Sequence, residues 1–163
     1  MKVGRLTLSD RAAAGIYEDR SGPEIESIIS SYFVDNLEFL RRLIPDDFAQ
    51  IKETLQALCE AQCALIVTTG GTGPGCRDVT PEATRAVVEK ELPGFGEIIR
   101  MRSYDFTPRA ILSRATAGVC GKSLIVNLPG NPKAVAECLP LLLPAIAECI
   151  DHVAGFRPQL RSP

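Results

Sequence analysis

Residues 63–75 read Cys-Ala-Leu-Ile-Val-Thr-Thr-Gly-Gly-Thr-Gly-Pro-Gly, a short apolar run that ends in a glycine-rich stretch. Apolar runs rich in β-branched residues are typical of strands that are covered on both faces of a parallel sheet. The four glycines within 70–75 let the backbone approach a ligand closely, and successive N–H groups in such a turn can bind an anion. A tight structural turn is the plain alternative, but we expect a buried strand over 63–69 followed by a functional loop.

Strand and helix patterns alternate on both sides of this stretch. Apolar residues predict strands over 3–8, 37–44 and 124–128, and a turn over 119–123 makes the last of them part of a short hairpin. Apolar spacing predicts helices from about residues 22, 48, 80 and 132, with Thr80 and Asn131 as N-caps. We expect the helix from 80 to end at Pro93, and Pro140 and Pro144 to kink or divide the last helix. A less regular helix is expected over 95–114, divided by Pro108.

Repeated strand–loop–helix units indicate an α/β fold, with a three-layer αβα arrangement around a mostly parallel, doubly wound sheet. The 163 residues support a single domain, which we place at 1–154, followed by a loosely held C-terminal tail at 155–163.

Composition excludes several classes of protein. With 45% hydrophobic and 23% charged residues, the chain is neither disordered nor fibrous. No long apolar run or secretory signal is seen, so we expect a cytoplasmic protein that does not insert into a membrane. A net charge of −2 argues against nucleic-acid binding. The six cysteines form no Cys-x-x-Cys pair, which predicts reduced thiols rather than a zinc site.

Four loops that follow predicted strands carry the candidate chemistry: residues 9–11, 45–47, 70–78 and 129–133. Ligands of doubly wound sheets bind beyond the carboxyl ends of the strands, so these loops are expected to converge there. The glycine loop is not a Walker A loop, because Cys76-Arg77 stands where Lys-Ser/Thr is required, and its glycine spacing differs from that of the dinucleotide fingerprint.

Asp46 and Asp78 are the candidate metal ligands. Mg²⁺ prefers carboxylate and substrate phosphate oxygens, and two aspartates at the same sheet edge as a glycine loop could supply the former. Each also has a structural alternative, because either could instead bond N–H groups at the start of a helix. Asp47 is expected to be such a plain cap.

Asn131-Pro132-Lys133 places a helix N-terminus and an ammonium group at the same edge. A helix N-terminus together with a lysine makes a second candidate anion site, although an ordinary proline-initiated helix has the same sequence. Ser9, Asp10 and Ser113 carry a weak signal when each is taken alone.

Taken together, the motifs form a specific set in chain order: Ser9-Asp10-Arg11-Ala12 with Gly15, Leu43-Ile44-Pro45-Asp46, Thr68-Thr69-Gly70-Gly71-Thr72-Gly73, Arg77-Asp78-Val79-Thr80-Pro81-Glu82, Pro93-Gly94-Phe95-Gly96, Ala110-Ile111-Leu112-Ser113-Arg114 and Asn127-Leu128-Pro129-Gly130-Asn131-Pro132-Lys133. The set resembles the molybdopterin adenylyltransferase family, which includes the molybdopterin-binding domains of gephyrin and of the plant adenylyltransferase. The resemblance covers roughly residues 3–153.

The resemblance implies a trimeric enzyme that adenylylates molybdopterin with Mg²⁺-ATP and releases pyrophosphate. It implies that Asp46 and Asp78 are the catalytic, metal-associated pair. Its nucleotide- and phosphate-binding residues would be Ser9, Asp10, Gly70, Gly71, Thr72 and Gly73, and its molybdopterin-binding residues Ser113, Pro129, Gly130, Asn131 and Lys133. A molybdenum-insertion protein is a possible partner. Cys76, beside the glycine loop, is expected to be an inert thiol.

Two alternatives remain open. A carrier that binds molybdopterin without adenylating it would share the fold, but it has less need of two carboxylates near phosphates. An unrelated nucleotide- or sugar-phosphate-binding domain would explain the glycine loop alone and not the other motifs.

Overall fold

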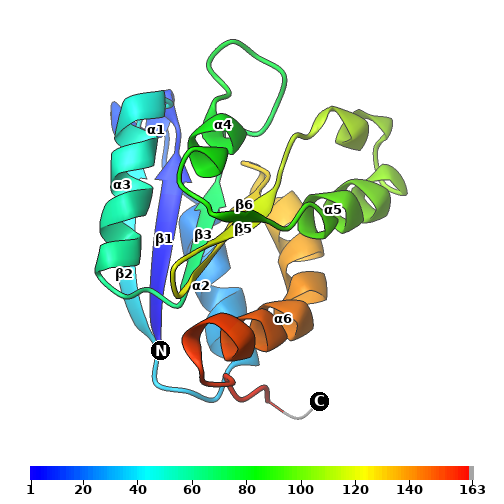
Figure 1. Ribbon diagram of the computed structural model, residues 1–163. Helices are drawn as coiled ribbons and strands as arrows, with labels where there is room; N and C mark the ends of the chain where they lie inside the picture. The colour runs from blue at the N-terminus through cyan, green and yellow to red at the C-terminus, as the bar shows by residue number, and fades with distance from the viewer. Residues whose placement is uncertain (162–163) are drawn as a thin grey trace.

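A six-stranded sheet forms the centre of the computed structural model, which describes residues 1–161 (Figure 1). Its strands stand in the order β2-β1-β3-β6-β5-β4. Their bounds are β1 Lys2–Leu8, β2 Glu38–Ile44, β3 Leu65–Thr69, β4 Lys90–Glu91, β5 Ala117–Cys120 and β6 Ser123–Leu128. The strands β2, β1, β3 and β6 run parallel, whereas β5 runs antiparallel to both β6 and β4. The predicted, mostly parallel sheet with a short hairpin is therefore confirmed.

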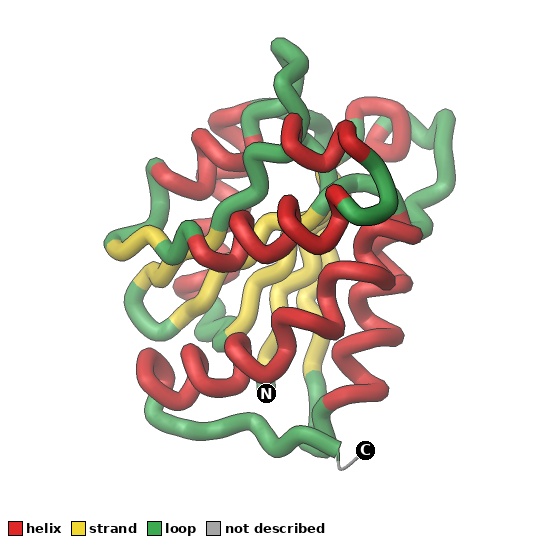
Figure 2. The backbone as a smooth tube through the Cα atoms, turned by 90° about the vertical axis from the view of Figure 1, so that its right-hand side faces the viewer, coloured by secondary structure: helices red, strands yellow, loops and turns green. Residues whose placement is uncertain are grey.

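Helices cover both faces of this sheet, as the view in Figure 2 shows. They are α1 Asp10–Ala13, α2 Ser21–Tyr32, α3 Phe48–Glu60, α4 Thr80–Arg85, α5 Gly94–Tyr104, the 3₁₀ helix η1 Pro108–Leu112 and α6 Pro132–Ala154. Among the described residues, no helix is both long and apolar enough to cross a membrane.

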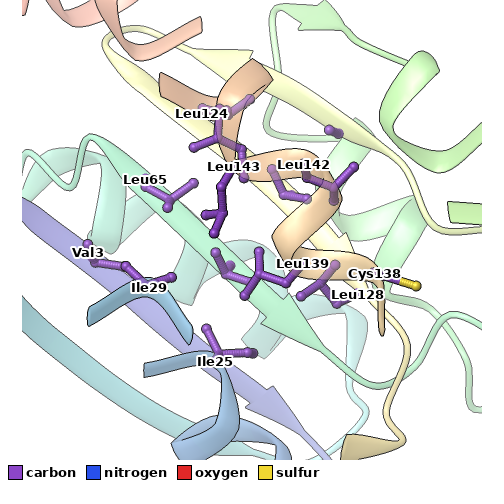
Figure 3. Close-up of a cluster of buried hydrophobic side chains, with 14 of the residues drawn as sticks. Val3, Ile25, Ile29, Leu65, Leu124, Leu128, Cys138, Leu139, Leu142 and Leu143 are labelled. Carbon is purple, nitrogen blue, oxygen red and sulfur yellow. The ribbon is translucent and has the colours of Figure 1, made fainter. Parts of the chain in front are cut away.

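The two faces of the sheet have separate apolar cores because successive residues of a buried strand point to opposite faces. Val3, Leu65 and Leu128 pack with α2 and α6 on one face, where Ile29 and Leu139 contribute (Figure 3). On the other face, strand residues pack against α3 and α4 to form a smaller cluster; its members are Leu6, Leu8, Ile51, Leu55, Leu58, Cys63, Ile66, Ala83 and Ile125. Burial on both faces explains why the sequence of β3 is continuously apolar.

The register of the parallel strands brings their carboxyl ends to one edge. Leu8 stands opposite Ile44, and Thr69 stands opposite both Thr7 and Leu128. Four connecting loops therefore begin at the same level, and Figure 1 shows the loop between β3 and α4 at the top of the molecule. The predicted convergence of the four candidate loops is confirmed.

Two local predictions differ from the structure around α4. This helix ends at Arg85 rather than at Pro93, because the following residues join the sheet edge: Glu89 N–H donates to the Val119 carbonyl over 2.8 Å. Thr80 is the first helical residue and not the N-cap. Its hydroxyl instead donates to the Gly70 carbonyl over 2.9 Å, so it holds the glycine loop.

Pro140 and Pro144 do not divide α6, which is continuous over 23 residues. Both prolines lie toward its outer side, where a carbonyl that loses its helical N–H partner can be hydrated. The predicted cap at the start of α6 is confirmed, because the Asn131 side chain accepts a hydrogen bond from Lys133 N–H over 2.9 Å.

Residues 156–161 of the expected tail run back beside the end of α2. Val34 N–H donates to the Gln159 carbonyl over 2.9 Å, and Arg161 N–H donates to the Tyr32 carbonyl over 2.7 Å. The last two residues of the expected tail, 162–163, lie outside the described residues.

Candidate active site

The turn after β2 holds Asp46, and the structure distinguishes its role from that of its neighbour. Asp47 is the N-cap of α3, with its carboxylate accepting from Gln50 N–H over 2.9 Å. Asp46 does not cap α3 and turns instead toward the start of α1, so the structural alternative open from the sequence holds for one of its two carboxylate oxygens. Its Oδ2 accepts from Asp10 N–H over 3.1 Å, and its own N–H donates to Asp10 Oδ1 over 3.0 Å.

The second carboxylate oxygen of Asp46, Oδ1, is buried and accepts no hydrogen bond from any group within residues 1–161. It faces the glycine loop, since a Cβ placed on Gly71 would stand 2.9 Å from it. Burial raises the pKa of the Asp46 carboxyl, and the negative charges of Asp10 and Asp78 add to this shift. An unsatisfied, half-buried carboxylate is costly unless a cation or a proton compensates it.

Asp78 lies on the other side of the same loop. Its Oδ2 accepts from Gly75 N–H over 2.8 Å, and a Cβ placed on Gly73 would approach the same oxygen to 2.8 Å. The side chain thus closes the glycine loop rather than capping α4, which was the alternative open from the sequence. Asp46 Oδ1 lies at Gly71 and Asp78 Oδ2 at Gly73 and Gly75, so both carboxylates lie against the same loop.

Arg114 holds the glycine loop from outside. Its Nε donates to the Gly73 carbonyl over 2.8 Å, its Nη2 donates to the Asp78 carbonyl over 2.6 Å, and its Nη1 pairs with Glu82. The sequence offered no signal for this contact, because Arg114 and Gly73 are 41 positions apart. A planar guanidinium with several fixed donors suits this kind of clamp.

Two cavities flank the ends of β3 and β6. The first, of about 290 Å³, is lined by Thr72, Gly73, Ile99, Ser103, Thr107, Arg109, Ala110, Leu112, Ser113, Pro129, Asn131 and Ala134. The second, of about 480 Å³, is lined by Thr7, Leu8, Ser9, Arg11, Ala12, Tyr17, Ser21, Thr69, Gly130, Asn131 and Pro132. Asn131 borders both, so the two cavities share a wall.

Each cavity contains an arginine that was not among the predicted binding residues, although Arg11 lies in the candidate loop 9–11. Arg109 and Arg11 form no ion pair with a carboxylate among residues 1–161. Arg11 instead lies over the Tyr17 ring, 5.5 Å from its centre. Arginine binds phosphate through its fork of donors, which gives both cavities a cation suited to an anionic ligand.

Most predicted site residues are brought together, but not all. Ser113, Pro129 and Asn131 line the first cavity, whereas Gly130 and Ser9 line the second. Gly70 and Gly71 form the loop between Asp46 and Asp78, and Thr72 and Gly73 reach the first cavity.

Six predicted residues lie outside the linings of both cavities: Asp46, Asp78, Gly70, Gly71, Asp10 and Lys133. The first four lie together at the glycine loop, whose residues Thr72 and Gly73 reach the first cavity. Lys133 is 81% exposed and stands 3.9 Å from Glu137. Asp10 pairs with Arg77 over 2.8 Å.

The carboxylate oxygens of Asp46 and Asp78, at the carboxyl edge of the sheet, suit Mg²⁺. Within residues 1–161, no group of three or more His, Cys, Asp or Glu side chains is arranged to hold an ion. Mg²⁺ does not need such a cage, since it is commonly bound through one or two carboxylates together with substrate phosphates. The unpartnered Oδ1 of Asp46 and the nearby Asp78 carboxylate fit that requirement.

The sequence matches a known protein family over most of its length. Residues 4–148 match the model of a probable molybdopterin binding domain. The chain belongs to this molybdopterin-binding family. The sequence resemblance drawn from the loop motifs is thereby confirmed.

Individual members of the molybdopterin-binding family are similar over nearly the whole chain. A molybdopterin adenylyltransferase of Helicobacter pylori is 52% identical over 154 residues, which are 94% of this chain and 88% of the relative. Gephyrin of Dictyostelium discoideum is 39% identical over 93% of this chain but only 22% of its own length. The crystal structure of the molybdopterin biosynthesis enzyme MoaB from Thermus thermophilus superposes with a TM-score of 0.88 at 38% identity, covering 97% of this chain and 99% of that one.

Proposed function

We propose that this protein is a molybdopterin adenylyltransferase, which transfers AMP from Mg²⁺-ATP to the terminal phosphate of molybdopterin. The products are adenylyl-molybdopterin and pyrophosphate. The observation that carries the proposal is that Asp46 and Asp78 both lie against the glycine loop, Asp46 beside Gly71 and Asp78 beside Gly73 and Gly75. A carrier would need the cavities but not the carboxylate pair, so the pair favours the enzyme.

The reaction forms one P–O bond and breaks another. A phosphate oxygen of molybdopterin attacks the α-phosphorus of ATP, and the bond from that phosphorus to the bridging oxygen of pyrophosphate breaks. The attacking phosphate is already anionic, so no side chain has to remove a proton. The enzyme must instead hold two anions close together and in line.

The chain supplies orienting groups on each side of this reaction. We place molybdopterin in the first cavity, with Ser113, Pro129 and Asn131, and the nucleotide in the second, with Ser9 and Arg11. Backbone N–H groups of residues 71–73 would bind phosphate oxygens between them, whereas the Gly70 N–H donates to the Leu128 carbonyl. Lys133 lies on the first turn of α6 and could reach the same phosphates if it left Glu137.

Asp46 and Asp78 would hold Mg²⁺ with the substrate phosphates. When bound, the ion would offset phosphate charge and so lower the repulsion between the two reactants. The unpartnered Oδ1 of Asp46 and its raised pKa support this assignment, because a cation there would stabilise the charged carboxylate.

We also propose a homotrimer in the cytoplasm. An apolar surface on α5, η1 and α6 supports assembly, since its side chains would otherwise remain in water. Its most exposed members are Met101, Tyr104, Ile111, Leu112 and Leu141, and Phe106 joins them from the loop between α5 and η1. All six cysteines are free thiols, which supports a reducing compartment.

Direct detection of the product tests the proposed activity. The purified protein is incubated with molybdopterin, ATP and Mg²⁺, and the reaction is followed by mass spectrometry. We expect adenylyl-molybdopterin and pyrophosphate in equal amounts, and no product after chelation of the metal. Tight binding of molybdopterin without any product would instead identify a carrier.

A further inference from the structure

An ion pair on the rim of the site links the two loops that hold the candidate catalytic carboxylates. We propose that Arg77 and Asp10 are positioning residues that fix the Asp46 carboxylate relative to Asp78. The inference rests on the proposed function for its catalytic consequence, but its structural content concerns the free protein. Neither residue lines either cavity, and their charged groups are paired with each other over 2.8 Å.

The first link is a two-point contact. Arg77 Nε donates to Asp10 Oδ2 over 3.0 Å, and Nη2 donates to Asp10 Oδ1 over 2.8 Å. Two parallel charge-assisted hydrogen bonds fix the direction of the carboxylate as well as its distance. A lysine could not provide this fork, because its ammonium acts as a single point charge.

The second link is reciprocal. Asp10 Oδ1 accepts from Asp46 N–H over 3.0 Å, while Asp46 Oδ2 accepts from Asp10 N–H over 3.1 Å. One carboxylate oxygen of Asp46 is therefore tied down, and the unpartnered Oδ1 is left facing Gly71. The direction in which the free Oδ1 of Asp46 points therefore depends on both hydrogen bonds to Asp10.

The third link is the peptide bond between Arg77 and Asp78. Arg77 immediately precedes Asp78, whose carboxylate closes the glycine loop at Gly75. The contacts thus run from Asp78 through Arg77 and Asp10 to Asp46, which joins the loop after β3 to the turn after β2. Loss of the ion pair would free these loops to move apart.

A second surface ion pair provides a matched control. Arg157 pairs with Glu148 over 2.6 Å, and their side chains are 60% and 46% exposed, against 61% and 43% for Arg77 and Asp10. Exposed pairs of this kind contribute little to folding. The Arg77→Met and Arg157→Met variants should therefore be similarly stable, and only the first should disturb the site.

Steady-state kinetics test the catalytic consequence. We expect Arg77→Met and Asp10→Asn each to lower kcat at least about tenfold, with KM for ATP and for molybdopterin changed less than about twofold. The double variant should lose no more than the worse single variant, because both changes break one contact. Arg77→Lys should recover only part of the loss, and Arg157→Met should retain wild-type kcat.

Two kinetic results would overturn the inference. A raised KM for ATP at unchanged kcat would show that Arg77 binds the nucleotide directly. Losses that multiply in the double variant would show that the two residues act independently.

Amide hydrogen exchange of the free protein, followed by NMR, separates this inference from the proposed function. Exchange at the Asp46 and Asp10 amides should accelerate at least about tenfold in Arg77→Met and stay unchanged in Arg157→Met. Unchanged exchange in Arg77→Met would refute the positioning role, whether or not the enzyme is active. Absence of product from the wild-type protein would instead refute the proposed function.

Discussion

Gly71 is the residue at which the glycine loop approaches the Asp46 carboxylate. Its φ is +62°, and a Cβ there would stand 2.2 Å from Thr80 Oγ1 and 2.9 Å from Asp46 Oδ1. A side chain would therefore meet two obstacles, the left-handed backbone and the hydroxyl that holds the loop. The free oxygen of Asp46 can face this loop because position 71 has no side chain.

Replacement of this glycine tests that statement. Gly71→Ala should lower the free energy of unfolding by about 2–3 kcal/mol, because backbone strain and overpacking add. It should also reduce turnover more than about tenfold, since Asp46 must shift. Chemical denaturation and kinetics measure the two effects.

Gly121 provides the matched control. Its φ is +55° with nothing within 4 Å of an added Cβ. Gly121→Ala should cost about 1 kcal/mol and leave turnover unchanged. Equal turnover in both variants would argue against a close approach of the loop to Asp46.

Three elements behind the site are joined by one charged cluster. Arg5 on β1 pairs with Asp19 over 2.7 Å and with Glu26 on α2 over 3.1 Å, and Glu26 also pairs with Arg41 on β2 over 2.6 Å. Arg5 and Glu26 are largely buried, so the loss of one partner leaves a charge uncompensated. The cluster fixes the position of α2 and of the chain just before it. Ser21, the first residue of α2, borders the second cavity.

The cluster predicts a pH-dependent stability. Burial alone would raise the pKa of Glu26, but hydrogen bonds from Arg41 and Arg5 outweigh it, and the pKa of this carboxyl is lowered. Its stabilisation is therefore present above the ordinary value of about 4.5 and lost as the pH falls through the lowered pKa. Glu26→Gln should reduce Tm at pH 7, with a difference from wild type that shrinks below about pH 4.

Glu53→Gln, at an exposed position on α3, is the control and should change Tm little at either pH. A Glu26→Gln difference that stays constant between pH 7 and pH 3 would show that Glu26 contributes through packing rather than charge.

At the scale of the whole molecule, the apolar surface on α5, η1 and α6 predicts assembly. Light scattering at micromolar concentration should give about three times the chain mass of 17.6 kDa. Met101→Glu should shift the mass toward 17.6 kDa, because a charge would be buried at the interface. Gln56→Glu, at an exposed position on α3, serves as control and should leave the mass unchanged. A wild-type mass of 17.6 kDa would refute the trimer.

The sequence predicted the architecture where local pattern determines it. The apolar run of β3, the turn at Gly121 and the cap at Asn131 depend on neighbouring residues, and each is as expected. The end of α4 was missed because pairing with β5, some thirty positions away, overrides local helix propensity.

The candidate site was predictable in part for the same reason. Parallel strands bring their carboxyl ends together, so the meeting of the Asp46 turn with the glycine loop followed from strand order. The contacts of Arg77 and Arg114 did not, because each depends on a partner far away in the chain and on the side-chain direction. The sequence could not separate the roles of Asp46 and Asp47 either. The structure separates them, because Asp47 accepts from Gln50 N–H and so caps α3.

The most direct test of the central claim compares turnover with binding in Asp78→Asn. Asparagine keeps an oxygen that can accept from Gly75 N–H, so the loop should remain closed while the charge is lost. We predict that adenylyl transfer falls at least about 100-fold, with Kd for molybdopterin changed less than about threefold. Turnover equal to that of the wild-type protein, or loss of binding in step with turnover, would contradict the account.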